Sequence, residues 1–234
     1  MKLKVLDLFS GIGGFSLGLE RTGGFETVAF CEIEPFPRRV LAKHWPKVPC
    51  YDDVRTLTGA RLAADGIFPD CIVGGFPCQD ISRAGHGAGL EGERSGLWRQ
   101  FRRLIGEVRP RVVVVENVPA LVDRGLSTLL GDLTELGYDA EWHVVSAAAL
   151  GADHLRQRIW IVAHPNEGEV RSGWFTGMQD RPSFDRARLV HARGSRKAYG
   201  FPDWLDRVGA CGNAVVPQIP ELIGRAILEA RIAA

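Results

Sequence analysis

The sequence predicts an α/β fold in which a mostly parallel sheet is flanked by helices. Short apolar, β-branched runs alternate with amphipathic helical patterns along most of the chain, which is typical of strands joined by crossover helices. A glycine-rich turn links the first apolar run directly to a helical pattern, as in nucleotide-type sites. The 234 residues, 45% of them hydrophobic and 24% charged, fit one globular domain with a sizeable core.

Each predicted element follows from a local pattern. The strands are the apolar runs at residues 5–9, 27–30, 71–73, 112–115, 143–146 and 159–163. The helices are the amphipathic segments at residues 15–21, 36–44, 97–108, 126–136 and 219–232. Gly137 supplies a stop for the fourth helix, and Pro217 and Pro220 bracket the start of the last one. Residues 165–208 have no clear period, so we expect a small inserted subdomain or a loop there.

Charge and cysteine usage limit the class of protein. The net charge of +1 does not indicate a nucleic-acid partner, so any site for a polyanion must be a local patch. The five cysteines are odd in number and form no CxxC pair, and the chain starts with a strand-like segment. We therefore expect a reduced, cytoplasmic protein without a signal peptide. The apolar runs are far shorter than the roughly 20 residues that span a bilayer, and the dispersed histidines predict no metal site.

The glycine turn and two later acids predict a nucleotide-type ligand. Glycines at residues 10–14 let the backbone approach a ligand closely, but Ser16 stands where the third glycine of a dinucleotide fingerprint belongs. Glu32 ends the next strand, where an acid can bind the two hydroxyls of a ribose, and Asp53 follows a third strand and can reach an adenine amino group. The alternative is that the glycines only make a tight turn and both acids are solvated.

A thiol and a carboxylate follow two of the predicted strands. Residues 74–79 form a stiff turn that carries Cys78, and Glu116 comes directly after the apolar run 112–115. Ligands of open α/β sheets bind beyond the carboxyl ends of the strands. A nucleophile and an acid at the same rim suggest covalent catalysis on one substrate.

Taken in order, these segments resemble the motifs of the DNA (cytosine-5)-methyltransferase family. Residues 7–14 resemble the motif that binds S-adenosylmethionine, residues 75–79 the nucleophile motif, and residues 116–118 the acid motif. Residues 156–158 look like the paired-arginine motif, and residues 212–217 resemble the closing motif that returns to the cofactor site. The resemblance implies a Rossmann-like fold of the S-adenosylmethionine-dependent methyltransferases and transfer of a methyl group to carbon 5 of cytosine in DNA.

The resemblance also implies roles for individual residues. The cofactor-binding residues are Phe9, Ser10, Gly11, Gly13, Gly14, Glu32, Ile33, Asp53, Val54, Pro77, Leu97, Asn213 and Ala214. The catalytic residues are Cys78, Glu116, Arg156 and Arg158, and the substrate-binding residues are Gln79, Ser82, Arg83, Arg94 and Asn117. In this scheme Ile33 packs on adenine, Asp53 and Val54 hold the adenine edge, and Leu97 lines the methionine end.

The chemistry explains why these residue types are needed. Carbon 5 of cytosine is a poor nucleophile, so the Cys78 thiolate adds to carbon 6, and Arg158 is a candidate for favouring the thiolate. Glu116 relieves the charge by hydrogen-bonding or protonating ring nitrogen 3, so we expect a raised pKa there. Asn117 is expected to fix loop geometry. The base must be flipped out of the duplex, and residues 82–94 suit a loop that closes over DNA, or an ordinary surface loop.

The region for target recognition is short. We expect a catalytic, cofactor-binding domain at residues 1–163 and 209–234, and a target-recognition segment at residues 164–208 whose arginines and aromatics contact double-stranded DNA. His154 and Leu155 depart mildly from the family pattern. A monomer is expected, and a separate recognition subunit stays open. The alternatives are a transfer-RNA cytosine-5 methyltransferase, an inactive DNA-binding relative that needs a partner, and an NAD-dependent oxidoreductase; restriction, phage defence and regulation all stay open as biological settings.

Overall fold

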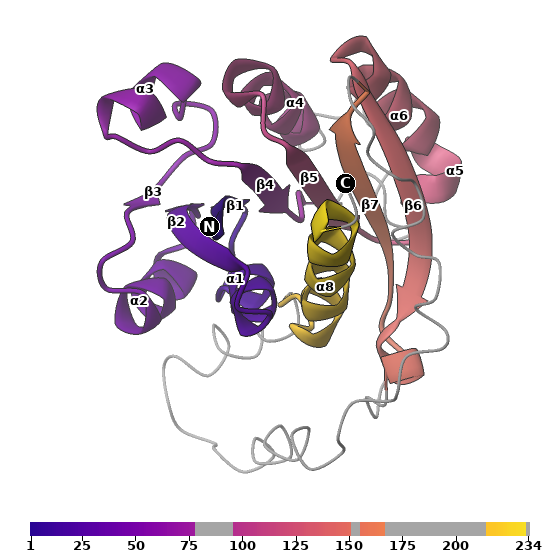
Figure 1. The fold of residues 1–234 in the computed structure, drawn as a ribbon, viewed down its shortest axis with the longest axis horizontal. Coiled ribbons are helices and arrows are strands. Elements are labelled where there is room, and N and C mark those ends of the chain that lie inside the picture. The colour runs from indigo at the N-terminus through magenta and orange to yellow at the C-terminus, as the bar shows by residue number, and fades with distance from the viewer. Residues whose placement is uncertain (78–95, 151–154, 167–213, 233–234) are drawn as a thin grey trace.

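A single seven-stranded sheet carries the site, and helices cover both of its faces (Figure 1). The computed structural model describes residues 1–77, 96–150, 155–166 and 214–232, and every structural statement concerns these residues. The strands are β1 (Leu3–Leu8), β2 (Phe25–Cys31), β3 (Cys50–Tyr51), β4 (Cys71–Gly74), β5 (Val112–Asn117), β6 (Tyr138–Ser146) and β7 (Gln157–Pro165). The helices are α1 (Gly14–Arg21), α2 (Pro35–His44), α3 (Gly59–Ala64), α4 (Gly96–Val108), α5 (Leu121–Arg124), α6 (Leu126–Glu135), the short η2 (Ala147–Leu150) and α8 (Gln218–Ile232).

The order of strands places several strand ends at one rim. The sheet runs β3-β2-β1-β4-β5-β7-β6. The first five strands of this order are parallel, and β7 is antiparallel to both of its neighbours. Leu8 lies opposite both Cys31 and Gly74, and Gly74 lies opposite Val115. The predicted mostly parallel sheet is therefore confirmed, and the carboxyl ends of β1, β2, β4 and β5 meet at the same edge.

Alternation along the strands divides the core between the two faces of the sheet. Leu3 and Val5 of β1 belong to a core that includes side chains of α1 and α8, whereas Leu6 and Leu8 belong to a core that includes α4 and α6. Figure 1 shows α1 and α8 side by side on the near face. Successive side chains of a strand point to opposite faces, so a central strand covered on both sides reads as one continuous apolar run.

The predicted elements are all present, and their ends extend further than expected at the sheet edge. The strand expected at residues 143–146 begins at Tyr138. The charged residues Asp139 and Glu141 interrupt the apolar pattern in the first half of this edge strand, so its start was not predicted. Gly137 has a φ of 77° and ends the preceding helix as predicted. The sequence analysis missed α3 and α5, which have six and four residues and are too short to show a helical period.

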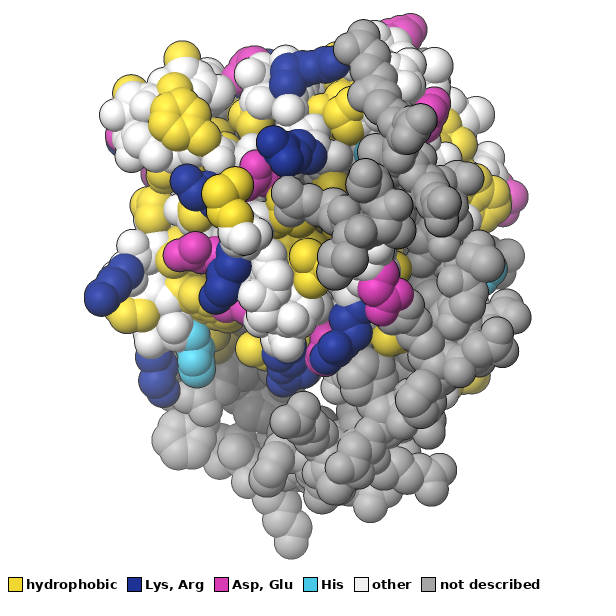
Figure 2. All heavy atoms as spheres, viewed as in Figure 1, with side chains coloured by type: hydrophobic (Ala, Val, Ile, Leu, Met, Phe, Trp, Pro, Cys, Tyr) yellow, Lys and Arg dark blue, Asp and Glu magenta, His cyan; other side chains and the backbone are white. Residues whose placement is uncertain are grey.

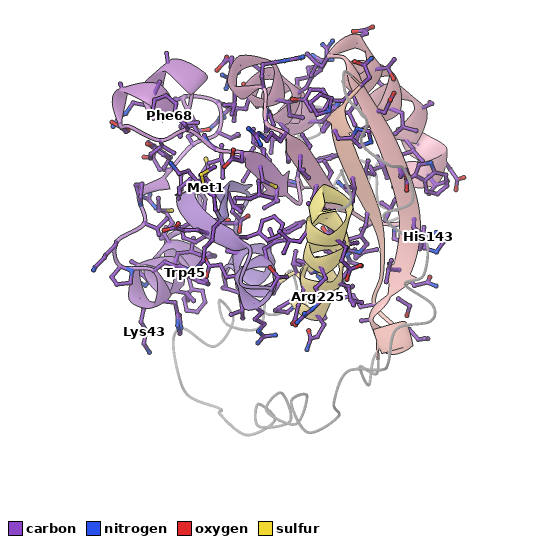
Figure 3. The ribbon with its side chains drawn as sticks, in the orientation of Figure 1. Met1, Lys43, Trp45, Phe68, His143 and Arg225 are labelled. Carbon is purple, nitrogen blue, oxygen red and sulfur yellow. The ribbon has the colours of Figure 1, made fainter. Side chains whose placement is uncertain are left out.

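The helices α1 and α8 approach each other closely through glycines of α1 and of the turn after it. A Cβ at Gly18 would lie 2.2 Å from the carbonyl oxygen of Pro217, and a Cβ at Gly24 would lie 2.3 Å from Leu228. Figure 3 labels Arg225 on α8, where its guanidinium donates to the Glu221 carboxylate at 2.9 Å. The chain therefore returns to the first helix after the region that the structure leaves undescribed.

The surface of the described part carries charges of both signs. On the face seen in Figure 2, Lys and Arg side chains are scattered and several stand beside Asp or Glu. This fits the net charge of +1. No helix of the described residues is long and apolar enough to cross a bilayer.

Candidate active site

The turn after β1 is built from residues in the left-handed region of backbone conformation. Phe9, Gly11 and Gly13 have φ angles of 53°, 53° and 85°. For Phe9 this conformation is unusual and costs of order 1–3 kcal/mol. A Cβ at Gly13 would lie 2.6 Å from Trp45, whereas a Cβ at Gly11 would meet no described atom within 4 Å. The turn is thus packed on its inner side and open at Gly11, as a backbone that receives a ligand requires.

Trp45 supports this turn from the end of α2. Its indole N–H donates to a carboxylate oxygen of Glu20 at 3.0 Å, and its ring stacks edge-on against Phe30 at 5.3 Å. Figure 3 labels Trp45 beside α2. The glycine at position 13 is therefore required by its φ angle and by this indole ring together.

Glu32 binds the glycine turn directly. One of its carboxylate oxygens accepts the Gly11 N–H at 2.7 Å, and the other accepts the Glu34 N–H at 2.8 Å. The residue is only 8% exposed. The alternative of a solvated strand-end acid is therefore wrong for Glu32. A carboxylate offers about four lone-pair positions, so two remain to accept hydroxyl groups.

The remaining residues predicted at the cofactor site differ in how they are held. Ile33 follows β2 with 57% of its surface exposed, whereas Val54 is buried. The Asp53 carboxylate is bound by the Arg55 guanidinium at 2.7 Å, and this hydrogen bond lowers the pKa of Asp53. The exposed side chain of Ile33 is therefore accessible to a ligand at the end of β2.

The predicted cofactor site also includes Ser10, Pro77, Leu97 and Ala214. The Ser10 hydroxyl donates to the Asp7 carbonyl at 2.6 Å and accepts the Cys31 N–H at 3.2 Å, so it joins the ends of β1 and β2. Pro77 is exposed, and Leu97 is partly buried in the first turn of α4. Ala214 precedes Val215, whose carbonyl oxygen would lie 2.4 Å from a Cβ at Gly14. The expected return of the closing motif to the glycine turn is therefore seen in the fold.

Ser16 has a partner that the sequence analysis missed. Its hydroxyl donates to Oδ2 of Asp7 at 2.7 Å, and both residues are fully buried. Burial raises the pKa of Asp7 to about 8. The serine in place of a third glycine is thus explained, because it hydrogen-bonds an acid beneath the turn. The sequence feature that could have indicated this pair is Asp7, an acid inside the otherwise apolar first strand.

A second group of side chains lies at the ends of β5 and β7. The Arg158 Nε lies 2.8 Å from Oε1 of Glu116, and the two side chains are 23% and 12% exposed. Burial raises the pKa of Glu116, although Arg158 and Arg156 act in the opposite direction. The expectation of a raised pKa at Glu116 is confirmed. Burial and the neighbouring Arg158 lower the pKa of Arg156.

The turn that leads to the predicted nucleophile lies against this carboxylate. A Cβ at Gly75 would lie 2.6 Å from Oε2 of Glu116. The Asn117 amide donates to the Phe76 carbonyl at 3.1 Å and accepts the Val118 N–H at 2.8 Å. Asn117 is 2% exposed, so its buried side chain fixes loop geometry, as expected, rather than offering a surface for substrate. This corrects its placement among the substrate-binding residues.

Six predicted site residues lie outside the described part of the chain. They are Cys78, Gln79, Ser82, Arg83, Arg94 and Asn213. The structure therefore brings Glu116, Arg156 and Arg158 together beside the turn at Gly75, and it places the glycine turn on the same rim of the sheet.

Comparison with known proteins identifies the family. The model of the C-5 cytosine-specific DNA methylases matches residues 3–193. The chain belongs to the C-5 cytosine-specific DNA methylase family. It is 34% identical over 223 residues to the type II methyltransferase M2.BsuMI of Bacillus subtilis, covering 92% of this chain and 55% of that protein. It is 37% identical over 209 residues to M.NgoMIV of Neisseria gonorrhoeae, covering 87% and 65% respectively. The chain thus spans between half and two thirds of these relatives.

Solved structures agree with the fold of this methylase family. A structure from E. coli, described as a prophage-encoded DNA modification methyltransferase, is 28% identical with a TM-score of 0.63 and covers 74% of this chain and 49% of that one. The S. pombe Dnmt2 methyltransferase is 23% identical with a TM-score of 0.60, covering 72% and 53%. The Rossmann-like methyltransferase fold predicted from the sequence is therefore confirmed.

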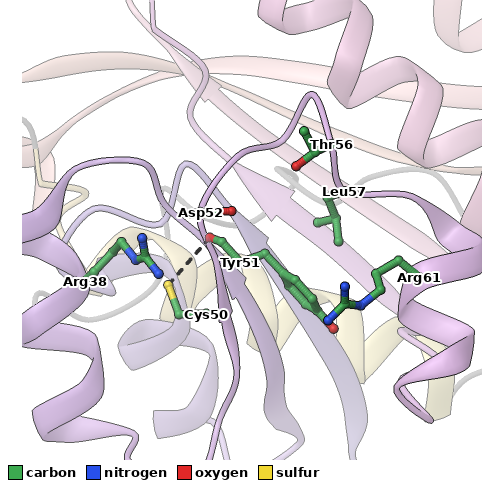
Figure 4. A pocket seen from close by; sticks show the side chains of 7 residues that line it. All are labelled: Arg38, Cys50, Tyr51, Asp52, Thr56, Leu57 and Arg61. Atoms are coloured by element: carbon green, nitrogen blue, oxygen red, sulfur yellow. Dashed lines mark hydrogen bonds between the residues drawn. The ribbon is translucent and has the colours of Figure 1, made fainter.

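A pocket of about 240 Å³ lies beside β3, next to the loop that carries Asp53 and Val54 (Figure 4). It is lined by Arg38, Cys50, Tyr51, Asp52, Thr56, Leu57 and Arg61. Arg61 is paired with Asp65 at 2.8 Å, and Figure 4 shows Arg38 directed at Cys50. The pocket contains none of the predicted site residues, so we assign it no role in the reaction.

Two of the three thiols of the described part lie in the core. Cys31 and Cys71 are buried, and burial raises the pKa of both, that of Cys31 to about 12. A buried thiol with a raised pKa is a poor nucleophile. The described residues contain no group of three or more His, Cys, Asp or Glu side chains that could hold a metal ion.

Proposed function

We propose that the chain transfers a methyl group from S-adenosylmethionine to carbon 5 of cytosine in double-stranded DNA. The observation that carries the proposal is the partly buried Glu116–Arg158 pair, 2.8 Å apart, beside the turn at Gly75 that leads into Cys78. Family membership supports the same reaction. We also propose residues 1–163 and 209–234 as the catalytic domain, and residues 164–208 as the segment that recognises the target.

The residues after β1 and β2 fit the proposed cofactor. The backbone is open above Gly11, the Glu32 carboxylate keeps acceptor positions, and Ile33 offers an exposed apolar surface. We infer that Glu32 binds the ribose hydroxyls, that Ile33 packs on the adenine, and that Asp53 and Val54 hold its edge. When bound there, S-adenosylmethionine supplies an electrophilic methyl group.

Glu116, Arg156, Arg158 and the turn at Gly75 form a group that we call the catalytic corner. We infer that this group acts on the cytosine base. The Cys78 thiolate adds to carbon 6 of a flipped cytosine, and electron density moves to carbon 5 and ring nitrogen 3. Glu116 donates a hydrogen bond or a proton at nitrogen 3, which its raised pKa favours because the protonated acid persists to higher pH. Arg158 orients the Glu116 carboxyl group, and Arg156 adds positive charge nearby. After carbon 5 is methylated, loss of its proton to a base expels the Cys78 thiolate.

The decisive experiment uses a substrate that blocks the last step. Purified protein is incubated with labelled S-adenosylmethionine and duplex DNA that contains 5-fluorocytosine, because fluorine at carbon 5 prevents proton loss. A labelled, denaturation-resistant protein–DNA complex is expected. It should be absent in Cys78→Ala and retained in Cys50→Ala, which removes a partly exposed thiol of β3.

The same assay separates the alternatives. An adduct with a 5-fluorocytosine transfer RNA, and none with DNA, would assign the chain to RNA. An adduct with neither, while S-adenosylhomocysteine still binds, would indicate an inactive relative or one that needs a separate recognition subunit. An adduct that survives in Cys78→Ala would refute the proposed nucleophile.

A further inference from the structure

Helix α4 is joined to the loop that follows β3 by an arginine. Nη2 of Arg103 donates to the carbonyl oxygens of Val54 and Leu57, at 2.9 and 2.8 Å. These two carbonyls belong to the loop that begins with Asp53. Val54 and Leu57 are both buried, with 5% and 2% of their surface exposed. One guanidinium therefore binds the backbone on both sides of the same turn.

The guanidinium is itself held in a fixed orientation. Its Nε donates to Oε1 of Gln100 at 2.9 Å, and its Nη1 donates to Oε1 of Glu107 at 2.8 Å. The second oxygen of Glu107 accepts the Gly59 N–H at 2.7 Å. The planar fork of arginine suits such a set of acceptors, since its donors are fixed relative to one another. The loop is thus attached to α4 at both its beginning and its end.

The backbone of the loop is held together by hydrogen bonds to Asp53. The N–H groups of Thr56 and Leu57 both donate to the Asp53 carbonyl, at 3.2 and 3.1 Å. The Arg55 N–H donates to Oδ1 of Asp53 at 2.9 Å. A displacement of the Leu57 carbonyl would therefore carry Asp53 with it.

The same helix also supports the two turns that flank the proposed cofactor. The Trp98 ring lies 5.6 Å from the Phe76 ring and 5.7 Å from the Phe101 ring. Phe101 in turn stacks on Phe9 at 6.4 Å. Phe9 opens the glycine turn, and Phe76 lies two residues before Cys78. Because α4 touches both turns, a loop fixed to α4 is also fixed relative to them.

We propose that Arg103 is a positioning residue. It holds the loop at residues 53–59 in the position at which the loop contacts the adenine of the cofactor. This inference rests on the proposed function, since it requires that Asp53 and Val54 contact the adenine edge. Arg103 acts through the loop backbone and not on the ligand. Its loss removes the donor from two backbone carbonyls of the loop and leaves Asp53 free to shift away from the adenine amino group.

The test measures ligand binding by calorimetry, with S-adenosylhomocysteine and with S-inosylhomocysteine, which lacks the 6-amino group. Arg103→Met should weaken the first ligand by about 10- to 100-fold, the range expected when charge-assisted hydrogen bonds are lost. It should weaken the second ligand less, so the preference for adenine falls. Arg103→Lys, whose ammonium can still donate to the carbonyls but lacks the planar fork, should recover part of that preference.

Arg102 provides a matched control on the same helix. Its guanidinium pairs with Glu135 at 2.6 Å and lies 3.4 Å from Asp132, both on α6. Arg102→Met and Arg103→Met should both lower the melting temperature, because each variant loses contacts of a guanidinium. In Arg102→Met the affinities for both ligands should stay at the wild-type value. Equal affinities and an equal preference for adenine in Arg103→Met and the wild type would overturn the proposal.

Two outcomes separate this inference from the function on which it rests. If the wild type binds neither ligand, the proposed cofactor site is wrong, and the role of Arg103 is wrong with it. If the wild type binds S-adenosylhomocysteine and Arg103→Met does not fold, Arg103→Lys decides: an unchanged preference for adenine refutes the proposal, and a reduced preference supports it.

Discussion

The cofactor side and the catalytic corner are made from different parts of the chain. At the glycine turn the backbone makes the site: three residues have positive φ angles, and the Gly11 and Glu34 N–H groups bind Glu32. At the corner, side chains from two antiparallel strands make it, through the contact between Glu116 and Arg158. A backbone site depends on local conformation, whereas a side-chain site depends on how distant segments pack.

The glycine turn and the catalytic corner should respond differently to mutation. Glycines of the turn are constrained by close neighbours, such as Val215 at Gly14 and Trp45 at Gly13. Substitutions there should affect folding and ligand affinity together. Substitutions of the corner side chains should affect the chemical step and leave ligand affinity unchanged, because strand β4 separates β5 from the glycine turn that follows β1.

The largest effect is expected for Glu116→Gln. The amide cannot donate a proton to ring nitrogen 3, and general acid catalysis typically contributes about 10²- to 10⁴-fold to a rate. We therefore expect methyl transfer to fall by at least about 100-fold, while the Kd for S-adenosylhomocysteine stays within about twofold of the wild type. Single-turnover kinetics and calorimetry measure the two quantities.

Glu135→Gln on α6 is the matched control, since Glu135 also pairs with an arginine but is exposed. It should leave the rate of methyl transfer unchanged. A loss of cofactor affinity in Glu116→Gln as large as the loss of rate would show that the two regions are not separate.

A smaller effect is expected for Gly75→Ala. The added methyl group would lie 2.6 Å from Oε2 of Glu116, so the carboxyl group or the turn must shift. A displacement of this kind can lower a rate by up to about 100-fold. Methyl transfer should fall, and binding of S-adenosylhomocysteine should change little.

Gly131→Ala in α6 controls for the added methyl group, because a Cβ there meets no described atom within 4 Å. This variant should have the rate of the wild type and equal or slightly higher stability. A wild-type rate in Gly75→Ala would mean that the turn at Gly75 and the Glu116 carboxyl group are not coupled.

The smallest effect on the reaction itself is expected at Asp7, a buried acid beneath the glycine turn. Asp7 has its pKa raised to about 8, so the folded state holds a proton that the unfolded state releases near pH 4. The stability that this proton contributes is fully present at low pH and is lost as the pH rises towards 8, by up to about 1.4 kcal/mol per pH unit.

The free energy of unfolding, measured in urea at pH 5.5 and 8.5, checks this sign. The wild type should lose more stability between the two pH values than Asp7→Asn, in which position 7 cannot titrate. Equal losses would mean that Asp7 does not change its charge in this range. Each protein is compared with itself at the two pH values, so a loss of stability that does not depend on pH does not affect the result.

Features set by neighbouring residues could be predicted from the sequence, whereas contacts between distant segments could not. The strands, the glycine turn and the glycine that ends α6 were predicted because a few consecutive residues dictate each of them. The edge strand β6 was predicted too short, since its exposed side chains hide the strand pattern. The Asp7–Ser16 pair was missed because no local pattern shows that two polar side chains will be buried together.

Local patterns of residues are enough to predict the alternation of strands and helices, the turn after β1, and the motifs that identify the family. These depend on side-chain period and on the φ angles that glycine permits, and both act over a few neighbouring residues. No local pattern shows that Glu116 contacts Arg158, that Gly75 lies against Glu116, or that Arg103 binds the loop after β3; these contacts are known from the folded structure. Those contacts join segments far apart in the chain, and they form only when the sheet order and the two cores have been packed.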